Sequence, residues 1–444
     1  IDRDNIADRL KQDALEIQGR LHRHLAESFK FPPTETDIKT CRGRQLSTTS
    51  IAATENGLYA YSGSKDGSII KWDLKTGKKL FVFPGGQKKT LAQDFQGHTD
   101  HVICLAVSSD NQFLASGGKD KKIIIWSVQD NKWLHCFKQQ HKDTITGMSF
   151  RKGYNQLYTV SNDRTVKLWN VDELSYIETL FGHQDSIMAV DSLAKEHCIS
   201  TGGRDRTVRL WKIVEESQLV FRGGGFVRPK KLRKDEPSEE EPPKVIPTEG
   251  PEGGVIMKQQ QTKDPSFLEG SLDCIAMIDE ENFLTGGDSG TISLWNIHKK
   301  KASFSMPLAH GHHKQPLDYS SGDATPSGGV ETPYWITALA TLRYSDMFVS
   351  GSWDGTIRVW QIGKNMKNFS LIASIPTVGV VNALQLYQPT SSKKTLLVAA
   401  IGQEHKLGRW MRIKEARNCM RVVELTTKTK DAAQGEGEDD EADE

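Results

Sequence analysis

The hydrophobic pattern of the chain is dominated by short runs in which apolar and polar residues alternate and which end in a tryptophan. Clear examples are TVKLW, ending at Trp169, and TVRLW, ending at Trp211. Alternation with a period of two and enrichment in β-branched residues are typical of β-strands that bury one face. A short polar stretch with an Asp precedes each run, which indicates that the strand is entered through a tight turn. The chain is therefore predicted to consist mainly of β-strands.

These runs form a repeat. An acidic residue precedes the Trp by six positions in six copies, whereas Ser289 takes that position in the fifth. The copies are GSKDGSIIKW ending at Trp72, GGKDKKIIIW at Trp126, VSNDRTVKLW at Trp169, GGRDRTVRLW at Trp211, GGDSGTISLW at Trp295, GSWDGTIRVW at Trp360 and IGQEHKLGRW at Trp410. Seven copies predict seven structural units.

Three consecutive repeats also share a His 28 residues before the Trp and a hydroxyl residue four residues before the Asp. An Asp can accept a hydrogen bond from a His, the His can meet a hydroxyl, and the hydroxyl can accept from the indole. The predicted structural tetrads are His98, Ser116, Asp120 and Trp126; His141, Thr159, Asp163 and Trp169; and His183, Thr201, Asp205 and Trp211. Recurrence in three copies indicates a structural role, and no other convergent set of titratable residues predicts an enzyme.

The joint spacing of Gly-His, Ser or Thr, Asp and a terminal Trp, with a period of about 42 to 43 residues, resembles the WD40 repeat. This resemblance implies an all-β, seven-bladed β-propeller over residues 36–427. Two extended segments, Asp37 to Arg42 and the C-terminal NCMRVVELTT, are alternative candidates for the strand that closes the ring. Residues 428–444 contain eight carboxylates in their last fourteen positions and are predicted to be a disordered acidic tail.

Residues 1–35 are predicted to form an N-terminal helical extension. Apolar residues recur at helical spacing, and Pro32 and Pro33 end the pattern, so an amphipathic helix is expected over residues 5–29. It could pack on the edge of the propeller or in a groove of a partner. We expect it near the first and last blades, where charged residues interrupt the apolar pattern and acidic residues of the helix could meet them: Lys71 and Arg409, with Asp8, Asp13 and Glu16.

Two insertions interrupt the repeats. Residues 223–270 are rich in Pro, Gly and charge and are predicted to be flexible; their RPKKLRK run is either a solvated surface, an electrostatic clamp or an import signal. The second insertion, residues 310–332, is also predicted to be flexible. It brings His310, His312 and His313 together, but no Cys or acidic residue has ligand spacing, so no metal site is predicted.

Composition excludes several protein classes. The six cysteines form no CxxC pair, which argues against a disulfide framework and favours a reducing compartment. No apolar run approaches the length of a membrane span. The formal net charge is +1, but the acidic tail contributes eight negative charges, so the rest of the chain is basic. Because the chain starts at Ile1, we expect it to begin inside a longer protein.

The last repeat is the most divergent. Its stretch GQEHKLGRWMRIKEAR, together with RLKQDALEIQGRL, QLSTTSIAA and SKDGSIIKWDLKTGKKL, resembles the eukaryotic family of U3 small nucleolar RNA-interacting WD-repeat proteins. The resemblance fails in both insertions and in the acidic tail. It implies a non-catalytic core protein of the U3 box C/D ribonucleoprotein, located in the nucleus and nucleolus and needed for small-subunit pre-rRNA processing. The implied partners are the box B/C region of U3 RNA, a kink-turn-binding box C/D protein and other small-subunit processome proteins, without a cofactor, membrane or small-molecule substrate.

The repeat geometry itself predicts one basic surface. Turns that carry the Asp share a face with the loops entering each first strand, and blades two to four place basic residues beside that Asp. The candidate RNA-binding residues are Lys119, Lys121, Lys122, Arg164, Arg204, Arg206, His405, Lys406, Arg409 and Arg412. Nearby Tyr334, Trp335 and Trp353 could stack a base, whereas Trp410 is expected to be a buried structural residue. The alternative function is a peptide-binding adaptor that uses the same cations against a phosphopeptide.

Overall fold

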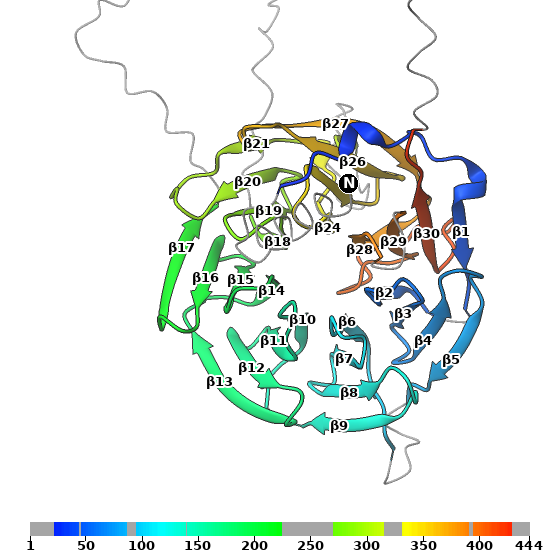
Figure 1. Ribbon diagram of the computed structural model, residues 1–444, viewed down its shortest axis with the longest axis vertical. Helices are drawn as coiled ribbons and strands as arrows, with labels where there is room; N and C mark the ends of the chain where they lie inside the picture. The colour runs from blue at the N-terminus through cyan, green and yellow to red at the C-terminus, as the bar shows by residue number, and fades with distance from the viewer. Residues whose placement is uncertain are drawn as a thin grey trace, which may run out of the picture.

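The computed structural model describes residues 22–43, 46–86, 95–138, 140–223, 270–314, 331–389 and 394–428. Seven four-stranded antiparallel sheets surround a central axis as the blades of a propeller (Figure 1). The first strand of each blade lines the axis, and these inner strands contact one another around a closed ring. The predicted all-β, seven-bladed architecture is confirmed.

The blades follow chain order, with strands a to d running from the axis outward. Blades one to three comprise β2 (Thr48–Ala53), β3 (Tyr59–Ser64), β4 (Ile69–Asp73) and β5 (Lys79–Phe83); β6 (Val102–Val107), β7 (Phe113–Gly118), β8 (Ile123–Ser127) and β9 (Trp133–Phe137); and β10 (Ile145–Phe150), β11 (Gln156–Ser161), β12 (Thr165–Asn170) and β13 (Ser175–Phe181).

Blades four to six comprise β14 (Ile187–Ser192), β15 (His197–Gly202), β16 (Thr207–Lys212) and β17 (Ser217–Arg222); β18 (Leu272–Met277), β19 (Asn282–Gly287), β20 (Ile292–Asn296) and β21 (Phe304–Met306); and β24 (Ala338–Thr341), β25 (Met347–Gly351), β26 (Thr356–Ile362) and β27 (Phe369–Pro376). A separate hairpin of β22 (His312–Lys314) and β23 (Glu331–Pro333) lies between blades five and six in the sequence. Most of both predicted insertions, residues 224–269 and 315–330, lies outside the described residues.

Blade seven joins the two ends of the chain. It contains β28 (Val380–Tyr387), β29 (Thr395–Gly402) and β30 (Cys419–Leu425), and its outer strand is β1 (Ile38–Cys41). The register pairs Ile38 with Val423 and Cys41 with Met420. Both candidate closing segments are therefore used, the C-terminal one as the third strand and the N-terminal one as the fourth.

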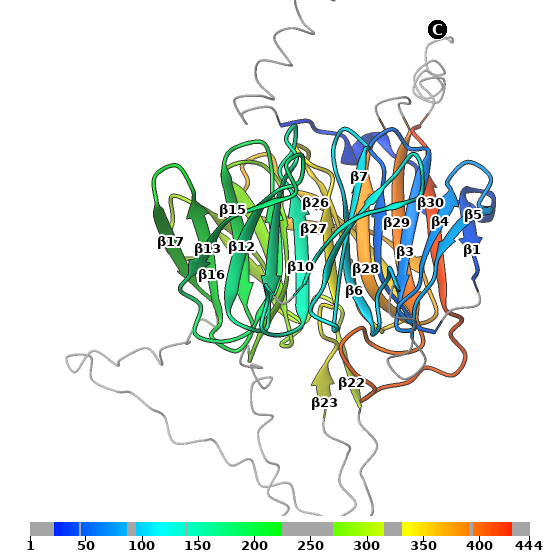
Figure 2. The same cartoon turned by 90° about the horizontal axis from the view of Figure 1, so that it is seen from below.

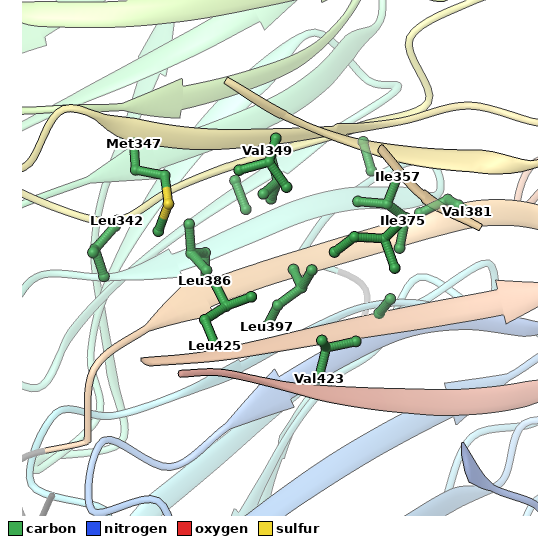
Figure 3. Packing of buried hydrophobic residues seen from close by; sticks show 14 of the residues in the cluster. Leu342, Met347, Val349, Ile357, Ile375, Val381, Leu386, Leu397, Val423 and Leu425 are labelled. Carbon is green, nitrogen blue, oxygen red and sulfur yellow. The ribbon is translucent and has the colours of Figure 1, made fainter. Parts of the chain in front are cut away.

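Packing between neighbouring blades forms the core. Trp169 of blade three is fully buried, and its ring centroid lies 4.4 Å from that of Phe137 in blade two. Between blades six and seven, aliphatic side chains from both sheets interdigitate (Figure 3); they include Met347, Val349, Ile357, Ile375, Val381, Leu397 and Val423. Burial of this apolar surface holds each blade to the next.

The N-terminal segment corrects one prediction. Residues 22–29 are not α-helical; they contain only the one-turn 3-10 helix η1 (Ala26–Ser28), and η2 (Glu35–Asp37) precedes β1. The backbone N–H groups of Leu25 and Ala26 donate to the Asp346 carboxylate at 2.7 and 3.0 Å, so tertiary hydrogen bonds override the helical pattern. Ala26 and Phe29 pack between blades six and seven, not one and seven. Residues 5–21 lie outside the described residues.

Lys71 has hydrogen-bond partners in the neighbouring blade, whereas its expected acidic partners, Asp8, Asp13 and Glu16, lie outside the described residues. Its buried ammonium donates to the Val128 carbonyl at 2.7 Å and to Asn131 at 2.9 Å, and it lies 4.1 Å from the Tyr59 ring centroid. Blade two therefore supplies hydrogen-bond acceptors for the Lys71 ammonium. All six cysteines are free thiols. No helix among the described residues is long and apolar enough to span a membrane.

Candidate RNA-binding surface

Loop 403–418 and the β22–β23 hairpin, which both depart from the repeat, lie on one face of the propeller. It is formed by the turns between strands b and c and by the loops from strand d to the next strand a, and we call it the turn face. The β22–β23 hairpin projects from it, on the side opposite the N-terminal segment (Figure 2). Its b–c turns are residues 65–68, 119–122, 162–164, 203–206, 288–291 and 352–355, and in blade seven the longer loop 403–418.

Hydrogen-bonded tetrads fix these turns. In blade two, His98 Nδ1 lies 3.1 Å from the Asp120 carboxylate and Nε2 lies 2.8 Å from Ser116 Oγ, which accepts from Trp126 Nε1 at 2.8 Å. In blade three the same bonds join His141, Thr159, Asp163 and Trp169 at 2.9 Å each. Although burial raises the Asp163 pKa, hydrogen bonds from His141 and Thr165 lower it overall. The carboxylates thus remain charged anchors.

In blade four, the prediction that Thr201 supplies the hydroxyl of the tetrad is wrong. Ser200, not Thr201, lies 2.8 Å from His183 Nε2 and accepts from Trp211 Nε1 at 2.8 Å. The turn that leads to Asp205 contains one more residue than in blades two and three, so counting back four positions from the Asp lands one residue too late. Thr201 Oγ1 is buried and has no hydrogen-bond partner among the described residues.

The structure contains a further tetrad, in blade six, that the sequence analysis did not predict. His310 Nδ1 lies 2.8 Å from Asp354 Oδ2, and Nε2 lies 2.7 Å from Ser350 Oγ, which accepts from Trp360 Nε1. The insertion after His310 lengthens the usual 28-residue spacing, which hid the relationship. His310 is therefore a blade-six anchor, and no group of three or more potential metal ligands occurs within the described ranges.

The basic residues of blades two to four occupy an unusual backbone position. Lys121, Arg164 and Arg206, each directly after the tetrad Asp, have φ of 65°, 68° and 53°. Blades one, five and six have glycine at this position: Gly67, Gly290 and Gly355. A non-glycine residue in the left-handed region costs roughly 1–2 kcal/mol. In three consecutive blades, a Lys or Arg therefore occupies a backbone position that is strained for any residue except glycine.

The remaining basic residues of these turns widen the charged surface. Lys119 and Arg204 precede the Asp and are exposed, whereas Lys122 is half-buried. Lys121 Nζ donates to the Lys142 carbonyl at 2.7 Å. A cleft of about 490 Å³ opens beside this bond between blades two and three, and its lysines are Lys121, Lys122, Lys138 and Lys142.

Loop 403–418 of blade seven replaces a short turn. The repeat predicted a strand that ends at Trp410, but β29 ends at Gly402 and β30 begins at Cys419. The apolar alternation lies in CMRVVEL, so the third strand forms there, after the loop. Trp410 is consequently 56% exposed rather than buried. The expectation of a structural Trp410 is therefore wrong.

Buried polar contacts anchor this loop. Lys65 of blade one, itself buried, donates to Glu404 Oε2 and to the Gly408 carbonyl, both at 3.1 Å. The Glu404 carbonyl accepts from Ser47 Oγ at 2.8 Å and from Asn382 Nδ2 at 3.0 Å. Burial raises the pKa of Glu404, but the Lys65 hydrogen bond and the charges of Lys65 and Arg409 lower it overall. The loop therefore has a fixed base on blades one and seven.

Two predicted contact residues of this loop face inward. Burial, reinforced by the charges of Lys406 and Lys65, lowers the pKa of His405 to about 3, so the imidazole is neutral at physiological pH. Burial also lowers the pKa of Lys406, whose titratable neighbours are Cys274, Cys104 and Asp273 on inner strands β18 and β6. His405 is therefore buried rather than on the open surface where it was expected, and Lys406 is half-buried. Their contact with RNA stays a prediction. Arg409 and Arg412 remain exposed.

An aromatic cluster continues the surface from the loop towards blade six. Neighbouring ring centroids are separated by 4.9 Å for His313 and Tyr334, 5.6 Å for Tyr334 and Trp353, 5.1 Å for Trp353 and Trp335, 6.2 Å for Trp335 and Trp410, and 5.2 Å for Trp410 and His405. The turn face thus has a cationic sector over blades two to four and an aromatic sector over blades six and seven.

Fold, repeats and tetrads together define a WD40 β-propeller protein. The family model "WD domain, G-beta repeat" matches residues 35–73, 89–127, 131–170, 174–212 and 329–361. The chain is 40% identical over 422 residues to U3 small nucleolar RNA-interacting protein 2 of Homo sapiens, with 95% of this chain and 76% of the relative covered. It is 32% identical over 458 residues to ribosomal RNA-processing protein 9 of Saccharomyces cerevisiae, with 94% and 78% covered.

Solved structures agree with these relationships. The structure of U3-55K has a TM-score of 0.71 and 39% identity, covering 88% of this chain and 99% of that chain. A crystal structure of RRP9 WD40 repeats has a TM-score of 0.71 and 40% identity, covering 89% and 99%. The chain belongs to the family of U3 small nucleolar RNA-interacting protein 2 and ribosomal RNA-processing protein 9.

Proposed function

We propose that this chain is a non-catalytic, RNA-binding scaffold of the U3 small nucleolar ribonucleoprotein. It recognises the box B/C region of U3 RNA together with a kink-turn-binding box C/D protein and supports small-subunit pre-rRNA processing in the nucleolus, with other processome proteins as further partners. The names of the relatives support an association with the U3 ribonucleoprotein and a role in ribosomal RNA processing. The turn face supports RNA as the ligand.

The observation that carries the proposal is the concentration of cations on this one face. Lys121, Arg164 and Arg206 hold left-handed backbone positions that glycine fills in three other blades. Arg409 and Arg412 extend from an anchored loop beside partly exposed aromatic rings. Phosphate contacts with aromatic stacking are the usual basis of recognition for unpaired RNA. The contact residues we assign are Lys119, Lys121, Lys122, Arg164, Arg204, Arg206, Arg409 and Arg412.

Arginine suits the exposed part of the loop because its planar guanidinium can hold a phosphate through two hydrogen bonds. Arg409 Nε lies 3.2 Å from Glu404 Oε2, yet 71% of its side chain is exposed. The ion pair orients the guanidinium while leaving most of it open. Lys65 holds the same carboxylate, so replacing Arg409 does not leave Glu404 without a cation.

The salt dependence of binding to U3 box B/C RNA tests the proposal. Each phosphate contact contributes about 0.7 to 0.9 to the slope of log affinity against log salt. The double variant Arg409→Ser/Arg412→Ser should therefore flatten the slope by roughly 1.4 to 1.8. The matched control is Lys75→Ser, in an exposed turn of the opposite face. An unchanged slope in a folded double variant would exclude this loop from the RNA contacts.

A phosphopeptide adaptor would use the same cations. It predicts that a phosphorylated peptide competes with RNA at comparable concentration, or that the wild-type protein ignores box B/C RNA altogether. Competition by unrelated RNA of equal length separates specific from purely electrostatic binding.

A further inference from the structure

We propose that Trp410 is a stacking platform for one unpaired base of the bound RNA. This inference rests on the proposed function and adds to it a contact of a different kind. The cations of the turn face recognise phosphates, which are the same in every nucleotide, whereas stacking requires a base that is free of its helix.

Trp410 differs in burial from the tryptophans that end the third strands of the blades. Those six are at most 5% exposed, while Trp410 is 56% exposed. The six are Trp72, Trp126, Trp169, Trp211, Trp295 and Trp360. An indole has a large apolar surface, and exposing it to water is unfavourable unless a ligand covers it.

The exposed indole is nevertheless held in place. A Cβ atom on Gly408 would lie 1.9 Å from Trp410 Cζ3, so the ring rests against the backbone of its own loop. The His405 ring centroid lies 5.2 Å away with an interplanar angle of 37°, and Trp335 lies at 6.2 Å. Because His405 is neutral, it packs as a flat, weakly polar neighbour. A ring fixed before binding loses little conformational entropy when a base covers it.

The surroundings favour a nucleotide over an apolar peptide. Arg409 is adjacent in sequence and Arg412 is two residues further on, and both side chains are exposed. A base on the indole would place its flanking phosphates within the reach of such side chains. Aromatic stacking beside a cationic groove is the arrangement that binds single-stranded nucleic acid. The loop base on Lys65 and Glu404 gives this platform a constant position relative to blade one.

The loss of affinity in Trp410→Ala is the first test. Removing one base stack should weaken binding of U3 box B/C RNA roughly 5- to 150-fold, equivalent to about 1–3 kcal/mol. Trp410→Phe keeps an aromatic ring and should retain most of the affinity. Because no phosphate contact is removed, the salt slope of Trp410→Ala should equal that of the wild type, in contrast to Arg409→Ser/Arg412→Ser.

A direct readout reports the stack itself. Box B/C RNA carrying 2-aminopurine at each unpaired position in turn should show one position whose fluorescence is quenched by the wild-type protein and by Trp410→Phe, but not by Trp410→Ala. Since the side chain is exposed, Trp410→Ala should melt within about 2 °C of the wild type, so that folding does not confound the comparison.

The outcomes separate this inference from the proposed function. Wild-type affinity in Trp410→Ala, with a flattened slope in the arginine variant, would overturn the stacking role and leave the RNA-binding function standing. Equal losses in Trp410→Phe and Trp410→Ala, without quenching at any position, would also overturn it. Failure of the wild-type protein to bind the RNA would reject the proposed function and the stacking role together.

Discussion

Lys65 Nζ of blade one and Glu404 Oε2 of blade seven lie 3.1 Å apart, in an ion pair that is almost fully removed from solvent on the lysine side. The pair joins the first and last blades across the ring closure. Burial lowers the pKa of Lys65, although the bond to Glu404 opposes this effect. The contact therefore couples the loop that carries Arg409 and Trp410 to the integrity of the ring.

Lys65→Met should destabilise the protein by about 2 kcal/mol, because it removes a hydrogen bond to a charged group and frees the Gly408 carbonyl. Glu404→Gln in the same background should recover part of the loss, since it removes a carboxylate that has lost its buried cation and is left with the exposed Arg409. Urea denaturation of both single variants and the double variant gives the coupling energy. Strict additivity would show that the pair contributes no net interaction.

Ser200→Ala should lower the free energy of unfolding by about 1–3 kcal/mol, because it leaves His183 Nε2 and Trp211 Nε1 without partners in the core. Thr201→Val is the matched control. Its hydroxyl has no partner among the described residues, so the loss should be small or absent. A larger effect at Thr201 than at Ser200, measured by chemical denaturation, would contradict the tetrad assignment.

Arg164→Gly should lower RNA affinity without lowering stability. Glycine adopts the φ of 68° without the steric penalty of a side chain, so stability should stay unchanged or rise by up to about 1 kcal/mol. The affinity for box B/C RNA should fall and its salt slope should flatten by about 0.7 to 0.9. Thermal melting and binding isotherms of one preparation test both statements; unchanged affinity would remove Arg164 from the contact surface.

His405 should make the protein sensitive to acid. Its pKa is about 3 in the folded chain and about 6.5 in the unfolded chain, so the unfolded state binds more protons between these values. Stability is fully present above pH 6.5 and should fall by up to about 1.4 kcal/mol per pH unit below it, or roughly 2 kcal/mol by pH 5. His405→Phe keeps a ring beside Trp410 but removes the proton.

The measurement is urea denaturation at pH 7.5 and pH 5.0 for both proteins. The difference between the two pH values should be smaller in His405→Phe by about the amount attributed to the imidazole. Equal differences in wild type and variant would show that protonation of His405 does not accompany unfolding.

Regular spacing decided what could be predicted. Seven blades and the tetrads of blades two and three follow from fixed distances between His, Asp and Trp. Where a turn gains one residue, as before Asp205, or a loop separates His310 from its blade, counting fails because hydrogen bonds depend on distance in space. The prediction that Trp410 is buried was wrong for another reason. The Trp stands at the repeat position, but the residues that alternate between apolar and polar lie after it, in Cys419–Leu425, and the strand forms there.

The candidate surface was partly predictable on the same basis. Short turns keep their side chains on the rim, so Lys121 and Arg164 lie where the repeat places them. In the long loop 403–418, tertiary contacts decide which cations point outward, and sequence alone does not contain that information. The N–H groups of Leu25 and Ala26 likewise bind Asp346, over 300 residues away, against the local helical preference.

Pairing of β1 with β30 imposes an order on synthesis. β1 leaves the ribosome before the other strands of the propeller, and the strand that covers its inner edge follows about 380 residues later. At about 5–20 residues per second, that edge stays unpaired for roughly 20 to 80 seconds. An open strand edge of this kind is a template for pairing with other chains. The nascent propeller is thus exposed to misassembly at β1 until β30 has been synthesised and pairs with it.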